Sequence, residues 1–144
     1  MTDLEKAKAA LKGHSLALCK GDDLRVFDGK GIAPLVKAVE SGSLVGYCAA
    51  DTVVGKAAAL LMINAGIKSV FAVNLSLSAK NALLTHGVEA SFDRLAEYIV
   101  NRDGTDLCPM EKTVANIDDP AKALSAIKRT LAALNAKNGA LTAE

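Results

Sequence analysis

The chain has 144 residues, the length of one domain of ordinary size. Hydrophobic residues make up 51% of it, which is enough to form a core and too many for a disordered chain. Only 3% of the residues are aromatic and the net charge is +1, so the sequence lacks the stacking platforms and the basic surface that nucleic-acid binding requires. We therefore expect a single domain, residues 1–144, that does not bind nucleic acid.

The N-terminus and the cysteines indicate a cytoplasmic protein. The first residues are charged and polar, so they do not form a signal peptide, and the longest uncharged apolar stretch, residues 57–67, is too short to span a bilayer. The three cysteines, Cys19, Cys48 and Cys108, are dispersed and odd in number, which argues against a disulfide framework and against a zinc site. We expect no membrane association, no metal and no cofactor, with Cys19 and Cys48 as small core residues.

The first part of the chain predicts a helix, a β-hairpin and a second helix. Residues 3–12 place Leu4, Ala7 and Leu11 on one helical face, and a glycine ends this N-terminal segment, residues 1–13. Two short strands, 15–20 and 24–28, flank a Gly-Asp-Asp turn and begin the core, residues 14–135. Residues 32–41 predict a helix with Pro34 in its first turn.

From residue 44 onward, strands and helices alternate. We predict strand 44–49, a helix over 52–65 capped by Asp51, strand 67–73, a helix from Ser76 or Ser78 to about residue 86, and strand 88–92. Residues 93–100 fit a helix or a strand, and 101–107 form a polar loop. A short helix over 109–115, a long amphipathic helix from residue 118 and a fraying tail, 136–144, complete the chain. This order predicts a three-layer α/β/α domain.

The predicted start of the helix over 52–65 carries the first candidate site. Ala50 and Ala57 stand where a phosphate-binding loop needs a glycine and a hydroxyl residue, so the segment is not such a loop. Lys56 lies in an otherwise apolar helix, where an unpaired charge is costly. We expect Lys56 either to reach an edge of the fold or to meet Asp51 or an anionic ligand.

Ser76 is the second candidate, because it follows a buried strand and begins a helix. Helix N-termini at the carboxyl ends of neighbouring parallel strands converge on one crevice, where ligands usually bind and where backbone amides favour anions. Ser76 is therefore either a helix cap alone or a cap that also contacts a ligand.

The third candidate is the start of the predicted helix over 109–115. Cys108 stands at the N-cap and Glu111 three residues later, so Glu111 can return to the cap in a capping box. The positive end of the helix favours a thiolate there, which makes Cys108 a candidate nucleophile with Glu111 or Asp51 in proton transfer. The alternative is a buried thiol at a structural cap.

The polar loop before Cys108 adds two candidate ligand-binding residues, Asn101 and Arg102. A guanidinium is a natural partner for a carboxylate or a phosphate. Arg102 fits equally well as a surface partner of Asp103 or Asp106.

Three separated motifs stand out along the chain. They are Gly31-Ile32-Ala33-Pro34-Leu35, the run Ala50-Asp51-Thr52-Val53-Val54-Gly55-Lys56-Ala57-Ala58-Ala59, and Asn101-Arg102 with Cys108-Pro109-Met110-Glu111. These motifs resemble those of an uncharacterised prokaryotic family, the domain-of-unknown-function family 1893. The resemblance covers about residues 14–130, with a threonine at position 52 where a basic residue is usual.

The resemblance implies a divergent cytidine deaminase-like fold, with a mixed five-stranded sheet that begins with a hairpin and has helices on both faces. Deaminases of this fold place a His or Cys with a Glu at the start of one helix and two Cys at the start of the next, to hold zinc and its hydroxide. Here the two places read Ala49-Ala50-Asp51 and Ser76-Leu77-Ser78-Ala79, so zinc-dependent deamination is not expected.

Three functions remain open at this point. The first is binding of a small molecule, a nucleotide or a nucleoside, in a deaminase-like pocket without zinc. The second is an enzyme that uses Cys108, and the third is a scaffold in which the Leu124–Leu134 face joins two chains as a homodimer. For the first two we expect Asp51, Lys56, Arg102 and Cys108 to line one crevice.

Overall fold

The computed structural model describes residues 1–100 and 107–142, with side chains described as far as residue 136. The elements follow the predicted order of a helix, a hairpin and then alternating strands and helices. They are α1 (Asp3–Ala10), β1 (Leu16–Lys20), β2 (Asp23–Phe27), α2 (Ala33–Glu40), β3 (Cys48–Val54), α3 (Lys56–Ala65), β4 (Ser69–Ser76), α4 (Leu77–Thr85), β5 (Glu89–Ala96), α5 (Pro109–Val114) and α6 (Pro120–Thr142).

The sheet is mixed, and within the described residues it has five strands in the order β2-β1-β3-β4-β5. The strand β1 pairs antiparallel with both β2 and β3, whereas β3, β4 and β5 are parallel. The predicted α/β class and mixed five-stranded sheet are thus confirmed. Because β3 and β4 are parallel neighbours, the helices that follow them begin side by side at the same end of the sheet.

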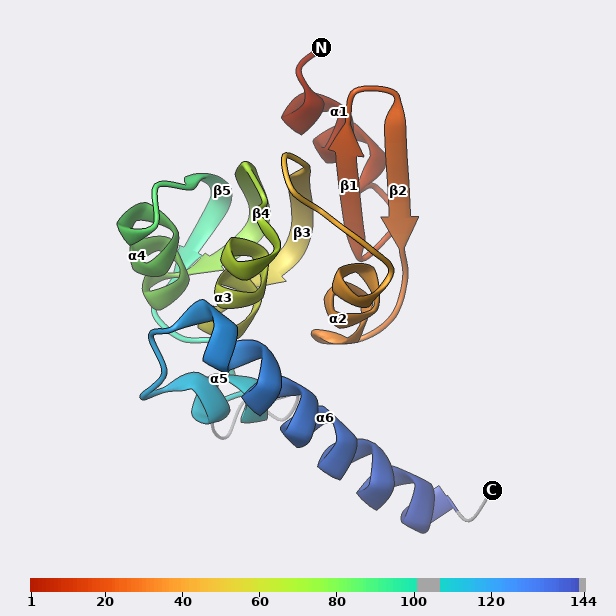
Figure 1. Ribbon diagram of the computed structural model, residues 1–144, viewed down its shortest axis with the longest axis vertical. Helices are drawn as coiled ribbons and strands as arrows, with labels where there is room; N and C mark the ends of the chain where they lie inside the picture. Colours follow the sequence, from red (N-terminus) through yellow and green to blue (C-terminus); the bar gives the residue numbers. More distant parts are fainter. Residues whose placement is uncertain (101–106, 143–144) are drawn as a thin grey trace.

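Helices cover both faces of the sheet, as predicted for a three-layer domain (Figure 1). On one face, α1 packs Ala7 and Leu11 against Ala17 and Phe71, which form a small second core. On the other face lie α2, α3 and α4, over the main core. The helices α5 and α6 form an outer layer against α3, and α6 extends away from the body of the molecule (Figure 1).

The helix α3 is buried on nearly every side because it lies between the sheet and α6. Residues 57–62 are each at most 7% exposed. Small side chains in its first turns allow neighbouring elements to approach closely. The apolar side chains of the last helix, Leu124, Ile127, Leu131 and Leu134, pack against this main core. They cover α3 rather than the sheet.

The boundary between β3 and α3 differs from the prediction. The strand continues to Val54, where Val53 and Val54 pair with Asn74 and Leu75 of β4, and the helix begins only at Lys56. The prediction of a helix over 52–65 was therefore wrong for its first four residues. Two adjacent β-branched residues favour an extended backbone when a neighbouring strand is available to pair with them. The sequence alone does not show that neighbour.

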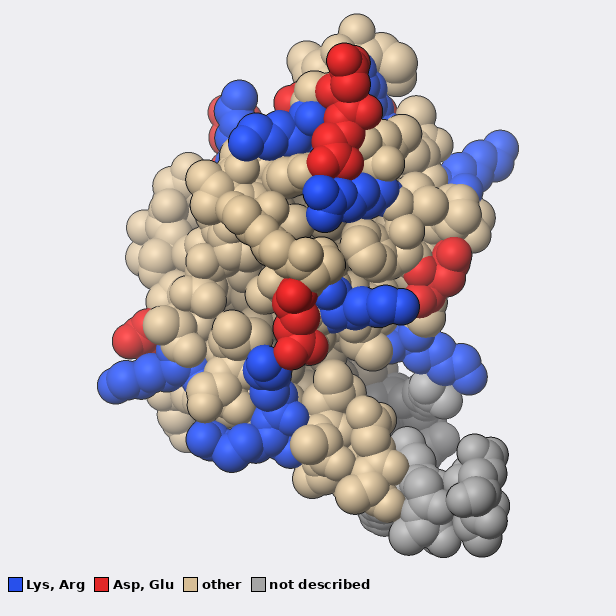
Figure 2. Space-filling view, turned by 45° about the vertical axis from the view of Figure 1, so that its right-hand side comes forward, with Lys and Arg blue, Asp and Glu red and all other residues tan. Residues whose placement is uncertain are grey.

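The ambiguous residues after 92 belong to β5 as far as Ala96. This strand lies at the edge of the sheet, and only Ala90, Phe92 and Ala96 are partly covered, while the remaining residues are exposed. An edge strand covered on one side has a weak hydrophobic pattern, which explains the ambiguity. Charges of both signs are interspersed over the face shown in Figure 2. In the part of the chain that the structure describes, no helix has the length and apolar character needed to cross a bilayer.

Candidate functional site

A pocket of about 190 Å³ lies beside the first turns of α3 and α4. Residues from both helices, from the segment that follows β5 and from α5 form its wall. They are Lys56, Ser78, Glu97, Tyr98, Ile99, Leu107, Glu111 and Ala115. The pocket therefore lies at the end of the sheet where the sequence predicted a ligand crevice.

Glu111 caps the N-terminus of α3 from a distant part of the chain. Its Oε1 accepts the backbone N–H of Lys56 at 2.8 Å, and its Oε2 accepts that of Ala57 at 3.0 Å. The helix has no side-chain cap of its own, because its N-cap residue is Gly55. The two amides that would attract an anionic ligand are therefore already occupied by a carboxylate of the protein.

Gly55 allows this contact because it has no side chain. A Cβ at this position would lie 2.5–2.8 Å from the three atoms of the Glu111 carboxyl group, closer than atoms can approach. The backbone of Gly55 is extended, with φ of −96°, so the conformation itself does not require glycine. The residue is needed for space, since the carboxylate occupies the volume of the missing side chain.

Lys56 extends to the edge of the fold and meets a carboxylate there, but that carboxylate is neither Asp51 nor a ligand. Its Nζ lies 2.9 Å from Oδ1 of Asp118 and donates to the carbonyl oxygen of Ala115 at 3.3 Å. The side chain is 16% exposed, whereas Asp118 is 92% exposed. Lys56 and Glu111 together therefore join the start of α3 to α5 and to the loop before α6.

Ser76 caps α4 locally, as one of the two sequence interpretations proposed. It is fully buried, and its Oγ accepts the backbone N–H of Ala79 at 3.1 Å. The same oxygen lies 3.2 Å from the Oγ of Ser78, which is exposed and lines the pocket. Ser76 supports the pocket wall from behind, and Ser78 is the residue that a ligand would reach.

Asp51 lies in the middle of β3, between Leu16 of β1 and Ala72 of β4, and does not cap a helix. The predicted cap was wrong because the strand continues for three residues beyond it. Its Oδ1 accepts the backbone N–H of Thr52 at 2.8 Å. Burial raises the pKa of this carboxyl group to about 7, and the backbone hydrogen bonds oppose the shift only in part. Asp51 is not among the residues that line the pocket.

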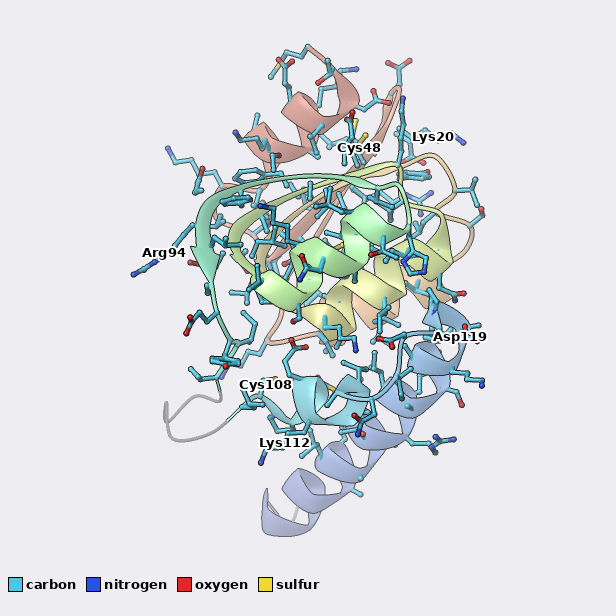
Figure 3. The ribbon with its side chains drawn as sticks, turned by 90° about the vertical axis from the view of Figure 1, so that its left-hand side faces the viewer. Lys20, Cys48, Arg94, Cys108, Lys112 and Asp119 are labelled. Carbon is cyan, nitrogen blue, oxygen red and sulfur yellow. The ribbon has the colours of Figure 1, made fainter. Side chains whose placement is uncertain are left out.

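Cys108 occupies the N-cap of α5 with Pro109 as the first helical residue, as predicted. The predicted capping box is wrong, since no side chain completes this cap and the Glu111 carboxylate turns to α3 instead. Cys108 is partly covered and packs against the main core. Figure 3 shows it at the start of α5, far from Cys48 near the opposite end of the sheet.

Cys19 and Cys48 face each other across β1 and β3 and are both buried and free. The prediction that they are small core residues is confirmed. Two further candidates, Asn101 and Arg102, lie outside the described residues. Of the four residues expected in one crevice, Lys56 lines the pocket and Cys108 begins the helix that contributes Glu111.

Sequence reasoning named Gly55 only within a family motif and did not foresee its contact with Glu111, and it missed the pocket residues Glu97, Tyr98 and Ile99. These three residues follow β5, in a segment whose sequence fits either a helix or a strand. The sequence pattern that could have identified them is a charged and an aromatic residue directly after a strand, at the end of the sheet where ligands bind. For Gly55 the signal was a glycine between a β-branched pair and a helical run.

The helix starts do not provide ligands for zinc. Gly55, Lys56 and Ala57 begin α3, and Ser76, Leu77 and Ser78 begin α4, so neither place offers a thiolate or an imidazole. Within residues 1–100 and 107–142 there is no group of three or more His, Cys, Asp or Glu arranged to hold a metal ion. The residues present therefore do not fit the zinc site of a deaminase.

Comparison with known proteins identifies one family. The family model described as domain of unknown function DUF1893 matches residues 6–131. The crystal structure of a DUF1893 family protein from Thermotoga maritima superposes with a TM-score of 0.81 at 24% sequence identity, over 90% of each chain. At that identity the superposition establishes the fold, and no curated protein sequence matches the chain.

Two deaminases give weaker structural matches. The dCMP deaminase of the cyanophage S-TIM5, in apo form, has a TM-score of 0.47 at 16% identity, covering 62% of this chain and 92% of its own. A diaminohydroxyphosphoribosylaminopyrimidine deaminase/5-amino-6-(5-phosphoribosylamino)uracil reductase from Thermotoga maritima has a TM-score of 0.41 at 15% identity. That match covers 76% of this chain and 39% of the reductase chain.

Proposed function

The chain belongs to the DUF1893 family, and we propose that it binds a small, nucleoside-like molecule in the pocket beside α3 and α4. One observation carries the proposal. A pocket at the carboxyl ends of parallel strands is lined by a carboxylate, Glu111, that two backbone amides hold in place. Pre-organised polar groups in a pocket at this place in an α/β sheet are typical of ligand sites.

The electrostatics of the pocket favour a nucleoside over a nucleotide. Glu97 and Glu111 both line it, and the ammonium of the cationic Lys56 is paired with Asp118. The amides at the start of α3 are occupied by Glu111. Within this pocket a phosphate would therefore meet carboxylates and find these two amides already used, whereas N–H and O–H donors of a base or sugar would find acceptors.

The size of the pocket agrees with a ligand of this kind. Its volume of about 190 Å³ is below the range of about 300–1,000 Å³ usual for drug-sized ligands. A shallower hollow of about 450 Å³ adjoins it and shares Tyr98 and Ile99 as walls. Its other wall residues include Arg94, which extends outward from β5 (Figure 3). We therefore assign the base to the first pocket and the sugar to the second.

Thermal unfolding with the four ribonucleosides and their monophosphates tests the proposal. Because a ligand at 100 times its Kd stabilises the folded state by about 2.7 kcal/mol, we expect a rise in Tm of roughly 5 °C or more for at least one nucleoside. Replacing Ser78 with a bulky residue, Ser78→Phe, narrows the pocket and should abolish the shift. It removes the hydroxyl group beside Ser76 but keeps the Ser76 Oγ that caps α4.

The matched control is Asn81→Phe, which places the same side chain at an exposed position of the same helix, outside both hollows. It should leave the ligand-induced shift unchanged. No shift with any nucleoside or monophosphate, in protein that unfolds cooperatively, would refute the proposal. Light scattering on the same samples tests the separate prediction of a homodimer.

A further inference from the structure

Two thiols lie opposite each other at the end of the sheet that is remote from the pocket. In the antiparallel pairing of β1 with β3, Cys19 and Cys48 are register partners in the last pair of the ladder. Both cysteines are free and buried, with exposed fractions of 0% and 4%. Directly opposite residues of such a ladder project to the same face of the sheet, so the two side chains are neighbours. Figure 3 shows Cys48 at this end, near Lys20, the last residue of β1.

The spacing of the two strands suits a disulfide bond between these cysteines. Opposite residues of an antiparallel pair have Cα atoms about 4.5–5.5 Å apart, and disulfides span Cα distances of about 4.4–6.8 Å. The Cβ atoms, about 4.5–5.5 Å apart in a ladder, must approach to roughly 3.8 Å. Cys19 and Cys48 lie next to the turn at Gly21 and the loop 41–47, where such a movement disturbs few backbone pairs. A disulfide closed under some strain is also reduced more readily than a relaxed one.

The two sulfurs have different hydrogen-bond partners, and this assigns them different roles. The Oγ of Ser69 donates to the Sγ of Cys48 at 3.0 Å. The Sγ of Cys19 instead donates to the carbonyl oxygen of Gly21 at 3.5 Å. Burial raises the pKa of the Cys19 thiol, and Asp3 and Cys48 add to the rise, so Cys19 keeps its proton. Because a hydroxyl donor can hold negative charge on sulfur, Cys48 is the sulfur that we assign as the nucleophile.

We propose that Cys19 and Cys48 form a redox-responsive site, in which a peroxide converts the two thiols to a disulfide that joins β1 to β3. Cys48 is the more exposed residue of the two, and hydrogen peroxide is little larger than water. The site does not depend on a ligand in the pocket, which lies at the other end of the sheet.

The reaction balances with peroxide as the oxidant. The Cys48 thiolate attacks one oxygen of hydrogen peroxide, the O–O bond breaks, and the departing hydroxide takes up the Cys48 proton and leaves as water. The sulfur of Cys19 then attacks the resulting sulfenic acid, the S–O bond breaks, and the Cys19 proton leaves with that hydroxide as a second water. The two thiols lose two electrons, which the peroxide gains. Exchange with a small thiol restores both cysteines.

Hydrogen peroxide, added to the complete folded chain and followed by an alkylating quench, tests the site by mass spectrometry. We expect the protein to lose the mass of two hydrogen atoms and to regain it with dithiothreitol. Tryptic cleavage puts Cys19 in peptide 13–20 and Cys48 in peptide 38–56, so the disulfide joins these two peptides. Because this map needs no substitution, it is decisive even where a cysteine variant does not fold.

Three variants sharpen the result. Cys48→Ala should abolish the link. Cys108→Ala is the matched control, because Cys108 lies at the start of α5, far from Cys48, and its loss should leave the link unchanged (Figure 3). Ser69→Ala keeps both sulfurs, and we expect it to slow the reaction about fivefold, since the hydrogen bond to Cys48 is lost.

The folded and the unfolded protein should give different products. In urea all three cysteines are accessible, so links to Cys108 should form as well, whereas the folded protein should give only the link between Cys19 and Cys48. The same mixture in the folded protein, or oxidation that adds oxygen without linking the two peptides, would overturn the proposal. An unchanged rate in Ser69→Ala would overturn the role of Cys48 as the attacking sulfur.

Discussion

Two neighbouring units of the same sheet, β3–α3 and β4–α4, cap the first amides of their helices in different ways. Each is a parallel strand followed by a helix whose first amides need acceptors. In β4–α4 the acceptor is Ser76, three residues before the amide that it caps. In β3–α3 it is Glu111, which is 54 and 55 residues away from the two amides that it caps.

The difference shows what each helix end can do. A local cap stabilises its own helix and little else. A remote cap connects two parts of the molecule, here the start of α3 with α5, and the ion pair between Lys56 and Asp118 reinforces that connection. It also brings a charged group into the pocket, which no local cap in α3 provides. The strands differ too, because β3 has an ionisable residue, Asp51, opposite Ala72 of β4.

The largest effect is expected from Asp51→Asn, measured as stability against pH. The pKa of Asp51 is raised from 3.8 in the unfolded chain to about 7, so the folded state binds more protons between these values. Stability of the wild type should therefore fall as the pH rises from about 4 to 7 and stay low above that. Asp51→Asn has no ionisable group at this position, so its stability should not fall in this way as the pH rises. At pH 8 it should be the more stable by at most about 4 kcal/mol, since each pKa unit corresponds to about 1.4 kcal/mol.

Urea denaturation of both proteins at pH 4, 6 and 8 measures this difference. The two should be nearly equal at pH 4, because Asp51 is protonated in the folded wild type there. A constant difference across the three pH values would show that Asp51 is ionised in the folded protein and has a solvated carboxylate.

The next largest effect is expected from variants of Gly55 and Glu111. Their effects on the free energy of unfolding should be strongly coupled. Glu111→Ala leaves two amides without their acceptor and should cost about 2 kcal/mol. Gly55→Ala forces the Glu111 carboxylate away from the backbone of residue 55 and should lower the free energy of unfolding by about the same amount. Once either change is made the contact is gone, so the double variant should cost little more than one of them. A double-mutant cycle of unfolding free energies gives this coupling directly. Additive costs would mean that the two residues act independently.

Hydrogen exchange distinguishes the remote cap from the local one. In Glu111→Ala, amides of α5 should lose protection together with those at the start of α3, because the same contact holds both. In Ser76→Ala, which should cost about 1 kcal/mol, the loss should be confined to the first turn of α4. Loss of protection in α5 on replacing Ser76 would contradict the contrast between the two units.

The smallest effect is expected from Asp118→Asn. Asp118 is 92% exposed, and an ion pair with an exposed carboxylate contributes only about 0.2–1 kcal/mol. Stability should fall by no more than that, and the difference should shrink in 1 M salt because mobile ions screen the pair. A loss as large as that of Glu111→Ala would show that the ion pair, not the carboxylate cap, holds α5 in place.

The sequence by itself determined the features that depend on local chemistry. The order of elements, the hairpin, a serine cap at Ser76 or Ser78 for α4 and the position of Cys108 at the start of α5 follow from turn residues, periodicity and capping preferences within a few residues. The mixed sheet followed from the family motifs. The ligand crevice that the parallel arrangement of strands predicts stays a prediction.

Only the tertiary structure decided the rest. Val53 and Val54 extend β3 because β4 lies beside them, so the helix start shifted from Thr52 to Lys56 and Asp51 became a strand residue. Glu111 does not form the expected capping box at Cys108. Its carboxylate instead accepts hydrogen bonds from the first amides of α3, because those amides have no acceptor nearby and Gly55 leaves room for the carboxylate. Backbone propensities act over a few residues, whereas an unsatisfied amide takes whichever acceptor the folded chain brings within about 3 Å of it.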